Sequence, residues 1–417
     1  MLKITCWRND LLAEFEAIKN HFDTLNFNTE HFVNSNDICT PMDCVKEMLD
    51  SLPNEFWQRK NIKVLDSCCG NGNFHAYAAL KTPLKNLYFN EINEKRIANL
   101  KSYFGENINL TIMDFLAFFE APEYDLVVSN PPYAKFNGDK RVSKNHNLSR
   151  AFIQKSLKIL KDGGYLLFIV PNNWMSFADR NDLPSELSKY QFRILDIGGA
   201  KKYFPQVGSS FTWFLLQKVP NNEAFEVHNH YVLKDTQLVK ITPNQRFIPL
   251  YHSQIVQNII DKTLNNQNLE KYQIQTSSNL HRYTKRECIS NKRDKTHIYK
   301  LIHTPSQVVF STKPHIYQEG YKVFISLTNQ YGTFIDNCGM TQSIAFIRCE
   351  SLAEAKQIKS ELDKPIYKFL NNITRYGNFN NIRILQNFPK FGSFELTKEE
   401  NAFIDNFNKE YYGKANQ

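Results

Sequence analysis

A chain of 417 residues is long enough for two domains, because single hydrophobic cores usually stop growing below this length. Hydrophobic residues make up 42% and charged residues 22% of the chain, which excludes a largely disordered protein. The net charge of +9 favours a polyanionic partner.

Cysteine and histidine spacing and the length of the apolar runs indicate the cellular compartment and argue against a metal site and a membrane span. Eight cysteines occur without a CxxC pair, which argues against a zinc ribbon and against a disulfide framework. The histidines have no metal-binding spacing such as HExxH. The opening sequence lacks the apolar core of a signal peptide, and the longest apolar run, residues 165–170, is too short to cross a bilayer. We therefore expect a cytoplasmic protein without a metal and without a membrane partner.

Short apolar runs in the first half predict buried β-strands. The predicted strands are residues 62–66, 87–89, 110–113, 126–128, 165–170 and 192–197. Helical patterns lie between them, such as residues 148–160, which Lys-Asp-Gly-Gly at 161–164 would end. This alternation predicts a doubly wound α/β sheet. A last strand, residues 211–216, follows its predecessor without a helix and is expected to pair antiparallel.

Ligands of such sheets bind at the carboxyl ends of the strands, where four polar segments occur in chain order. The first runs from Asp66 to Gly72, and its glycines, Gly70 and Gly72, allow a tight turn close to a ligand. Because it lacks the third glycine of GxGxxG, it suits a cofactor without a pyrophosphate better than NAD. Glu91 follows the second strand, where an acid commonly holds ribose hydroxyls. Asp114 begins the third segment. Singly, each segment also fits a turn or a helix cap.

The fourth segment is Asn130-Pro131-Pro132-Tyr133. Proline fixes φ and disfavours helix for the residue before it, so the segment is stiff and non-helical. The Asn130 side-chain oxygen and the Pro131 carbonyl oxygen could together accept both hydrogens of an –NH₂ group, and Tyr133 offers a face for stacking. None of these residues is a strong base, which favours activation by orienting a nitrogen lone pair. Taken alone, the tetrapeptide also fits a strand-exit turn.

In this order, the segments resemble the gamma-class, TaqI-like N6-adenine DNA methyltransferases of bacterial restriction-modification systems. The matching pieces are Thr40-Pro41, VLDSCCGNGNF, Glu91-Ile92, MDFL at 113–116, SNPPY, AFIQKSLKILKDGGYLLFIVPNNW and YFPQV at 203–207. The order is the specific part, since Asn-Pro-Pro-Tyr alone also occurs in methyltransferases that act on glutamine and RNA. The resemblance implies a Rossmann-like methyltransferase domain over residues 1–221 and a mixed α+β target-recognition domain over residues 222–417.

The resemblance also implies S-adenosylmethionine as the cofactor. The implied cofactor-binding residues are Thr40, Asp66, Gly70, Gly72, Glu91, Ile92, Asp114, Phe115 and Asn130. Thr40 and the backbone of the glycine loop would hold the methionine part, and Glu91 would bind the ribose hydroxyls. Asp114 and the Phe115 amide would read the cofactor adenine, while Ile92 would pack on it.

For the substrate, the resemblance implies an adenine flipped out of duplex DNA. Asn130 and the Pro131 carbonyl would accept hydrogen bonds from the N6 amino group, and Tyr133 and Phe204 would press on the base. Direct methyl transfer to the oriented nitrogen would follow, with loss of a proton afterward. The implied enzyme is a monomer that protects DNA from a cognate restriction endonuclease, which would be a further partner.

The second half of the chain lacks the strand-helix alternation. Residues 281–300 carry seven Lys or Arg against two acidic residues, with tyrosine and histidine interleaved. This composition suits a surface that follows DNA phosphates, although an exposed basic loop has it as well. Residues 371–378 are polar and could present side chains to base edges. The predicted DNA-binding residues are Arg282, Lys285, Arg286, Lys292, Arg293 and Arg375. The base sequence that they would read is not apparent.

Two other function classes fit part of this pattern. A methyltransferase acting on RNA or on protein glutamine could use the same tetrapeptide, but it would not need a basic second half. A DNA-binding module without catalysis would have no use for the cofactor residues. We therefore expect a site-specific, adenine-specific DNA methyltransferase.

Overall fold

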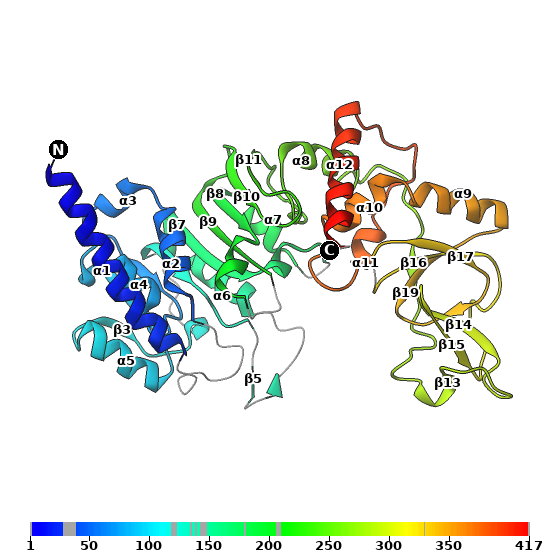
Figure 1. Cartoon of the computed structure of the whole chain (residues 1–417), viewed down its shortest axis with the longest axis horizontal. Helices are drawn as coiled ribbons and strands as arrows, with labels where there is room; N and C mark the ends of the chain where they lie inside the picture. Colours follow the sequence, from blue (N-terminus) through cyan, green and yellow to red (C-terminus); the bar gives the residue numbers. More distant parts are fainter. Residues whose placement is uncertain are drawn as a thin grey trace. The chain divides into compact units, whose positions relative to one another are not determined.

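The computed structural model describes residues 2–27, 39–117, 123–133, 136–137, 140–141, 148–178, 181–205, 210–328 and 330–415. The chain divides into two compact units (Figure 1). Unit 1 comprises Met1–Trp174, Leu183–His230 and Asp235–Gln245, and unit 2 comprises Met175–Asp182, Tyr231–Lys234 and Arg246–Gln417. Among the described residues, no helix has the length and apolar character needed to cross a bilayer.

Unit 1 is built on a nine-stranded sheet (Figure 1). Its strands are β1 (Val64–Asp66), β2 (Leu87–Asn90), β3 (Asn109–Thr111), β4 (Tyr124–Ser129), β7 (Leu160–Pro171), β8 (Tyr190–Ile197), β9 (Phe211–Pro220), β10 (Phe225–Asn229) and β11 (Asp235–Val239). Their spatial order is β11-β10-β8-β9-β7-β4-β1-β2-β3. From β3 to β7 neighbouring strands are parallel, whereas β9 runs antiparallel to β7 and β8. The predicted α/β sheet and the antiparallel last strand are confirmed.

Helices surround this sheet. They are α1 (Leu2–Phe27), α2 (Met42–Asp50), α3 (Asn54–Gln58), α4 (Asn73–Ala78), α5 (Glu94–Phe104), α6 (Leu148–Ile159) and α7 (Leu183–Leu187). In α2, buried Val45, Met48 and Leu49 recur at helical spacing and give the helix one apolar face. The helices α1, α2 and α4 contact one another, and α6 contacts β7. Strand residues are therefore buried on both faces, as the near-continuous apolar runs indicated.

Two local predictions differ from the structure. The helix expected over residues 148–160 ends at Ile159, and residues 161–164, predicted as a helix stop, are part of β7. The predicted domain boundary at residue 221 precedes β10 and β11, which nevertheless belong to the sheet of unit 1. There β10 pairs in parallel with β8, and β11 pairs antiparallel with β10. These added strands follow a turn rather than a helix and lie beyond the last matching motif, YFPQV at 203–207, so neither the alternation nor the resemblance reached them.

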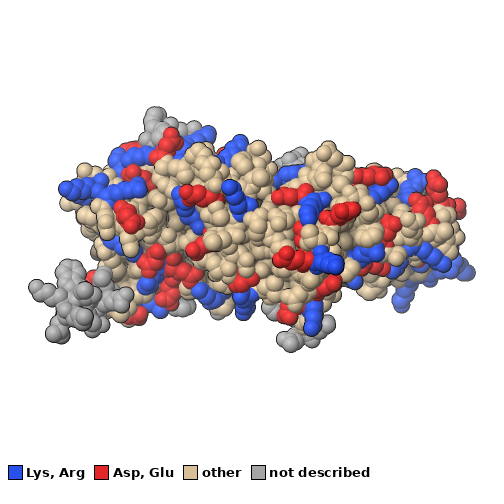
Figure 2. Space-filling view, turned by 90° about the horizontal axis from the view of Figure 1, so that it is seen from above, with Lys and Arg blue, Asp and Glu red and all other residues tan. Residues whose placement is uncertain are grey.

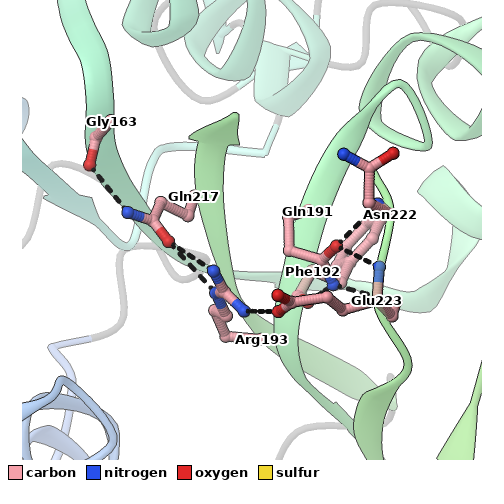
Figure 3. Close-up of polar contacts among 7 residues, drawn as sticks. All are labelled: Gly163, Gln191, Phe192, Arg193, Gln217, Asn222 and Glu223. Carbon is pink, nitrogen blue, oxygen red and sulfur yellow. Dashed lines mark hydrogen bonds and ion pairs between the residues drawn. The ribbon is translucent and has the colours of Figure 1, made fainter. Parts of the chain in front are cut away.

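Polar contacts fix the turn that leads into β10 (Figure 3). The Gln191 side chain, only 1% exposed, accepts hydrogen bonds from the backbone amides of Asn222 at 3.0 Å and Glu223 at 2.9 Å. It also donates to the Glu223 carbonyl oxygen at 3.1 Å. Beside it, Arg193 bridges the Gln217 side-chain oxygen, at 2.8 Å, and the Glu223 carboxylate. Burial makes the Gln191 contacts the stronger part of this network.

Replacement of Gln191 by alanine is expected to lower the free energy of unfolding by about 2–3 kcal/mol, because buried backbone groups lose their partners. Urea unfolding followed by circular dichroism measures this loss. Arg193→Ala serves as the matched control, since its ion pair is exposed and worth at most about 1 kcal/mol. Equal losses in the two variants would contradict the role assigned to Gln191.

Unit 2 combines two four-stranded sheets with helices. One sheet has the order β12 (Gln275–Thr276), β19 (Ile344–Arg348), β16 (Lys322–Ser326) and β17 (Thr333–Asp336). The other has the order β13 (Ile289–Ser290), β15 (Gln307–Ser311), β14 (Tyr299–Thr304) and β18 (Gly339–Met340). The helices are α8 (Gln254–Lys262), α9 (Leu352–Leu362), α10 (Pro365–Asn372), α11 (Ile382–Leu385) and α12 (Lys398–Ala415). The predicted mixed α+β character of the second half is confirmed.

Candidate active site

A cavity of about 370 Å³ lies at the carboxyl ends of β1, β2 and β4 in unit 1. Polar side chains from successive parallel strands meet at such an edge because all these strands run the same way. The predicted residues that line the cavity are Thr40, Asp66, Gly70, Glu91, Ile92, Asp114, Phe115, Asn130, Pro131 and Tyr133. Two further predicted residues of unit 1, Gly72 and Phe204, are not among the described residues that line it.

The glycine loop after β1 turns through left-handed backbone conformations. Gly70 has φ of 58° and Gly72 has φ of 91°, values that favour glycine over other residues. A Cβ atom on Gly72 would lie 2.6 Å from the Phe104 ring and 2.8 Å from the Leu100 side chain. Gly72 therefore lets the loop pack against α5, whereas Gly70 borders the cavity.

Glu91 is fixed by the backbone around it. Its Oε2 accepts a hydrogen bond from the Gly70 amide at 2.8 Å, and its Oε1 accepts from the amides of Ile92 at 2.8 Å and Asn93 at 2.9 Å. Oε1 already accepts two hydrogen bonds, whereas Oε2 accepts one and could accept another from a ligand's hydroxyl. The Glu91 carboxylate thus joins the glycine loop to the end of β2.

The cavity has an apolar part near the end of β3. Ile92 is 63% exposed beside it, and buried Phe115 stacks on Phe152 with ring centroids 5.2 Å apart. The Oδ1 of Asp114 accepts a hydrogen bond from the Leu116 amide at 3.0 Å. Phe152 comes from α6 and was not predicted as a site residue, because its only sequence signal was an apolar helix face. Together these side chains suit a flat ligand with a polar edge.

Asp66 is a buried acid at the end of β1. Its side chain is 1% exposed, and burial raises the pKa of its carboxyl to about 8, with nearby Glu91 adding to the shift. The Asp66 Oδ1 accepts a hydrogen bond from the Cys68 amide at 3.3 Å, which opposes this shift only in part. The carboxyl is therefore mostly protonated at neutral pH unless a cation faces it.

The Asn130 amide is held on both sides. Its Nδ2 donates to the Thr40 hydroxyl oxygen at 3.0 Å, and the Tyr133 hydroxyl donates to its Oδ1. The Thr40 carbonyl oxygen in turn accepts from the Asn73 side chain at 2.8 Å. In addition, the Cys68 thiol lies 3.4 Å from the Asn130 carbonyl oxygen. An amide oxygen has two lone pairs, so such a group can accept hydrogen bonds from both a tyrosine hydroxyl and a substrate N–H.

Tyr133, Phe211 and Phe204 form a row of aromatic rings. The centroids of Tyr133 and Phe211 are 5.7 Å apart, and those of Phe211 and Phe204 are 5.2 Å apart. Phe204 is 5% exposed and belongs to the core of unit 1, where it supports Phe211. Burial raises the pKa of the Tyr133 hydroxyl well above its usual range, so this group acts as a hydrogen-bond donor. The part of the predicted YFPQV motif at 206–207 lies outside the described residues.

The basic residues predicted to bind DNA lie in unit 2. Lys285, Arg286, Lys292 and Arg293 are exposed, and none of them forms an ion pair with another described residue. By contrast, basic and acidic side chains are interspersed over the face shown in Figure 2. Arg282 is partly buried, and its guanidinium donates to other side chains of unit 2.

Two asparagines of the segment at residues 371–378 are buried rather than exposed, contrary to the expectation from the sequence. Asn371 and Asn372 are each 1% exposed, and the Asn371 side chain donates to the Asn380 side-chain oxygen at 3.1 Å. The prediction that these asparagines could reach base edges is wrong, because they close the core beneath the loop. Arg375 donates to the Asn378 carbonyl oxygen at 2.9 Å within the same loop.

The sheet order, the glycine loop and the Asn-Pro-Pro-Tyr segment at one cavity define a Rossmann-like methyltransferase fold. Residues 21–204, somewhat less than half of the chain, match the family model described as Eco57I restriction-modification methylase. The predicted resemblance to restriction-modification methyltransferases is thereby confirmed.

Individual relatives are similar to part of the chain as well. Type II methyltransferase M.HincII of Haemophilus influenzae is 25% identical over 211 residues, which cover 46% of this chain and 38% of that protein. Type II methyltransferase M.TthHB8I of Thermus thermophilus is 32% identical over 97 residues, 19% of this chain and 23% of the relative. The chain thus matches less than half the length of either protein.

Solved structures are similar to most of the chain in fold. A nuclease-deletion mutant of the Type ISP restriction-modification enzyme LlaGI, in complex with a DNA substrate mimic, aligns with a TM-score of 0.54. The alignment covers 89% of this chain and 54% of that chain at 11% identity. At this identity the likeness concerns the fold alone.

Proposed function

We propose that this chain transfers a methyl group from S-adenosylmethionine to N6 of a flipped-out adenine in duplex DNA, as the modification enzyme of a restriction-modification system. The observation that carries the proposal is the Asn130 amide, held at the cavity by Thr40 and Tyr133 with its oxygen able to accept from an amino group. The match of residues 21–204 to a restriction-modification methylase family model supports it. In this proposal unit 1 performs the transfer and unit 2 contacts the DNA target.

The cavity residues fit S-adenosylmethionine, which supplies an electrophilic methyl group on a sulfonium. Two carboxyl groups, those of Asp66 and Glu91, suit a ligand that carries positive charge. The fixed Oε2 of Glu91 suits a ribose hydroxyl, and the apolar faces of Ile92 and Phe115 suit an adenine ring. Thr40 and the glycine-loop backbone would then border the methionine part.

The target adenine is hidden inside the base stack and must leave it, at a cost of a few kcal/mol. Stacking on an aromatic ring stabilises the flipped base by ~1–3 kcal/mol, and in this proposal the ring is that of Tyr133. Phe204 supports the same aromatic row through Phe211. The base is thereby held beside the Asn130 amide.

The amide oxygen of Asn130 and the carbonyl oxygen of Pro131 accept the two hydrogens of the N6 amino group. This turns the nitrogen lone pair out of conjugation with the ring and toward the methyl group. Neither oxygen is a strong base, so the proton would leave N6 for solvent after the new N–C bond has formed and the S–C bond of the sulfonium has broken. The role of the protein is thus orientation and hydrogen bonding rather than prior deprotonation.

Labelled S-adenosylmethionine tests the proposed function directly. The purified chain is incubated with the label and with duplex DNA, single-stranded RNA or a release-factor protein that presents a glutamine. We expect label only in the DNA, recovered as N6-methyladenine after digestion to nucleosides. Label found only in RNA or protein would contradict the proposal and identify the alternative substrate. Modification-sensitive sequencing of a methylated plasmid would then reveal the target site and whether one strand or both are modified.

A further inference from the structure

Residues 281–300 of unit 2 carry a strong concentration of positive charge. This segment has seven Lys or Arg and two acidic residues, so its net charge of +5 is more than half of the +9 of the whole chain. It forms two exposed turns, residues 281–288 before β13 and residues 291–298 between β13 and β14. One of its two acids, Asp294, lies in the middle of the second turn, directly among the basic residues.

Asp294 organises the backbone of this second turn. Its Oδ1 accepts hydrogen bonds from the amides of Thr296 at 2.8 Å and His297 at 2.7 Å, and from the Thr296 hydroxyl at 2.9 Å. Its Oδ2 lies 2.9 Å from the His297 Nδ1. An aspartate that bonds backbone amides two and three residues ahead replaces a backbone turn and restricts the chain. These amides also hold the pKa of Asp294 well below its usual range.

Arg282 ties the two basic turns to the sheet. One terminal nitrogen donates to the Gln307 side chain in β15 at 3.0 Å, and the other donates to the Asn291 side chain at 2.9 Å. The Arg282 amide donates to the Gln342 side-chain oxygen at 2.9 Å. The base of the second turn is therefore anchored by Arg282, and its tip is ordered by Asp294. Lys292, which lies between these anchors, is exposed.

We propose that Asp294 is a positioning residue of the DNA-contacting surface, where it orders the turn that presents Lys292, Arg293 and Lys295 to phosphates. This inference rests on the proposed function. An exposed carboxylate among basic side chains should weaken DNA binding by repulsion, yet salt screens this repulsion strongly. A turn that is ordered before binding avoids the entropy lost when a flexible loop is fixed on DNA. We infer that the second effect outweighs the first.

Three substitutions separate the order of the turn from its charge. Asp294→Ala removes both the charge and the acceptor, whereas Asp294→Asn removes the charge but keeps an oxygen that can accept from the two amides. Glu287→Ala is the matched charge control, because Glu287 is exposed in the same segment and, among the described residues, its carboxylate accepts only a weak contact from the Cys288 thiol at 3.8 Å. Binding of the full chain to a fluorescein-labelled duplex DNA of mixed sequence is measured by fluorescence anisotropy over a series of salt concentrations.

We expect Asp294→Ala to raise the Kd for duplex DNA ~10-fold, while Asp294→Asn and Glu287→Ala bind as tightly as the parent chain or more tightly. Hydrogen exchange at the Thr296 and His297 amides should become faster in Asp294→Ala and stay near the parent rate in Asp294→Asn. If both Asp294 variants gain affinity as Glu287→Ala does, only charge matters and the inference is overturned. If the parent chain does not bind duplex DNA at all, the proposed function itself falls.

Discussion

Replacement of Asn130 by alanine is expected to lower the rate of methyl transfer to DNA ~100- to 1,000-fold, the range found when one preorganised hydrogen-bond partner of a reacting group is removed. The physical reason is that one of the two hydrogens of the N6 amino group would lose its acceptor. Only the Pro131 carbonyl oxygen would remain to orient the nitrogen. The rate is measured with labelled S-adenosylmethionine and duplex DNA at saturating substrate. Cofactor binding, followed by isothermal titration calorimetry, should stay measurable, because most of the cavity lining is unchanged.

The contacts of Asn130 supply controls for this result. Thr40→Ser keeps a hydroxyl oxygen for the Asn130 Nδ2, whereas Thr40→Val removes it. If Thr40 orients the amide, the valine variant should lose kcat and the serine variant should recover most of it. A Thr40 that only binds cofactor would instead change KM with little effect on kcat. Turnover near the parent rate in Asn130→Ala would show that the amide is not the group that orients N6.

Tyr133 has two roles in the proposed reaction: its ring stacks on the base, and its hydroxyl donates to Asn130. Two substitutions separate these roles in the same assay. Tyr133→Phe keeps the ring but removes the hydroxyl that donates to Asn130, whereas Tyr133→Ala removes both. With 2-aminopurine at the target position, fluorescence reports whether the base is held outside the stack. The alanine variant should alter this signal, and the phenylalanine variant should mainly slow the transfer.

The sequence identified most of the cavity because parallel strands place their carboxyl ends together. Asp66, Glu91, Asp114 and Asn130 each follow an apolar run, so the strand pattern alone predicted that they meet. Thr40 was different, since it precedes the first strand and only the family resemblance pointed to it. Its contact with Asn130, 90 positions along the chain, depends on how α2 packs and has no local signal.

The sequence was least informative about which side chains face a ligand and which pack in the protein interior. Gly72 looked like part of a ligand loop, yet it allows close packing on α5. Phe204 looked like a residue facing the substrate base, yet its ring lies in the core behind Phe211. Asn371 looked like a base-reading side chain, yet it is buried. In each case the residue type was informative, but the direction of the side chain is set by tertiary packing.

Asp66 links the cavity to the stability of unit 1 through its pKa. In the folded chain the pKa is about 8, against about 3.9 for aspartate in an unfolded chain. Between these pH values the folded chain holds a proton that the unfolded chain has released. The stabilising contribution is therefore complete below about pH 3.9 and is lost as the pH rises through about 8, with a slope of ~1.4 kcal/mol per pH unit.

Replacement of Asp66 by asparagine should remove this dependence, because a neutral amide does not titrate. Urea unfolding of both proteins is measured between about pH 5 and 8. The free energy of unfolding of the variant should rise relative to that of the parent by ~1.4 kcal/mol per pH unit, with a plateau above about pH 8. The unfolding transition to compare is the one that S-adenosylmethionine shifts to higher urea, since only a unit that binds the cofactor is stabilised by it. A pH-independent difference would contradict the assignment.

The same substitution should uncouple cofactor binding from proton release. S-adenosylmethionine carries a net positive charge, and a cation at the cavity favours the ionised form of Asp66. Binding to the parent chain near pH 7 should therefore release ~1 proton, which calorimetry in buffers of different ionisation enthalpy can count. S-adenosylhomocysteine lacks the sulfonium charge and should release fewer protons. Asp66→Asn should bind S-adenosylmethionine more weakly and release no proton, because an amide can neither ionise nor attract the cation. Equal proton release in the parent and the variant would assign the titration to another group.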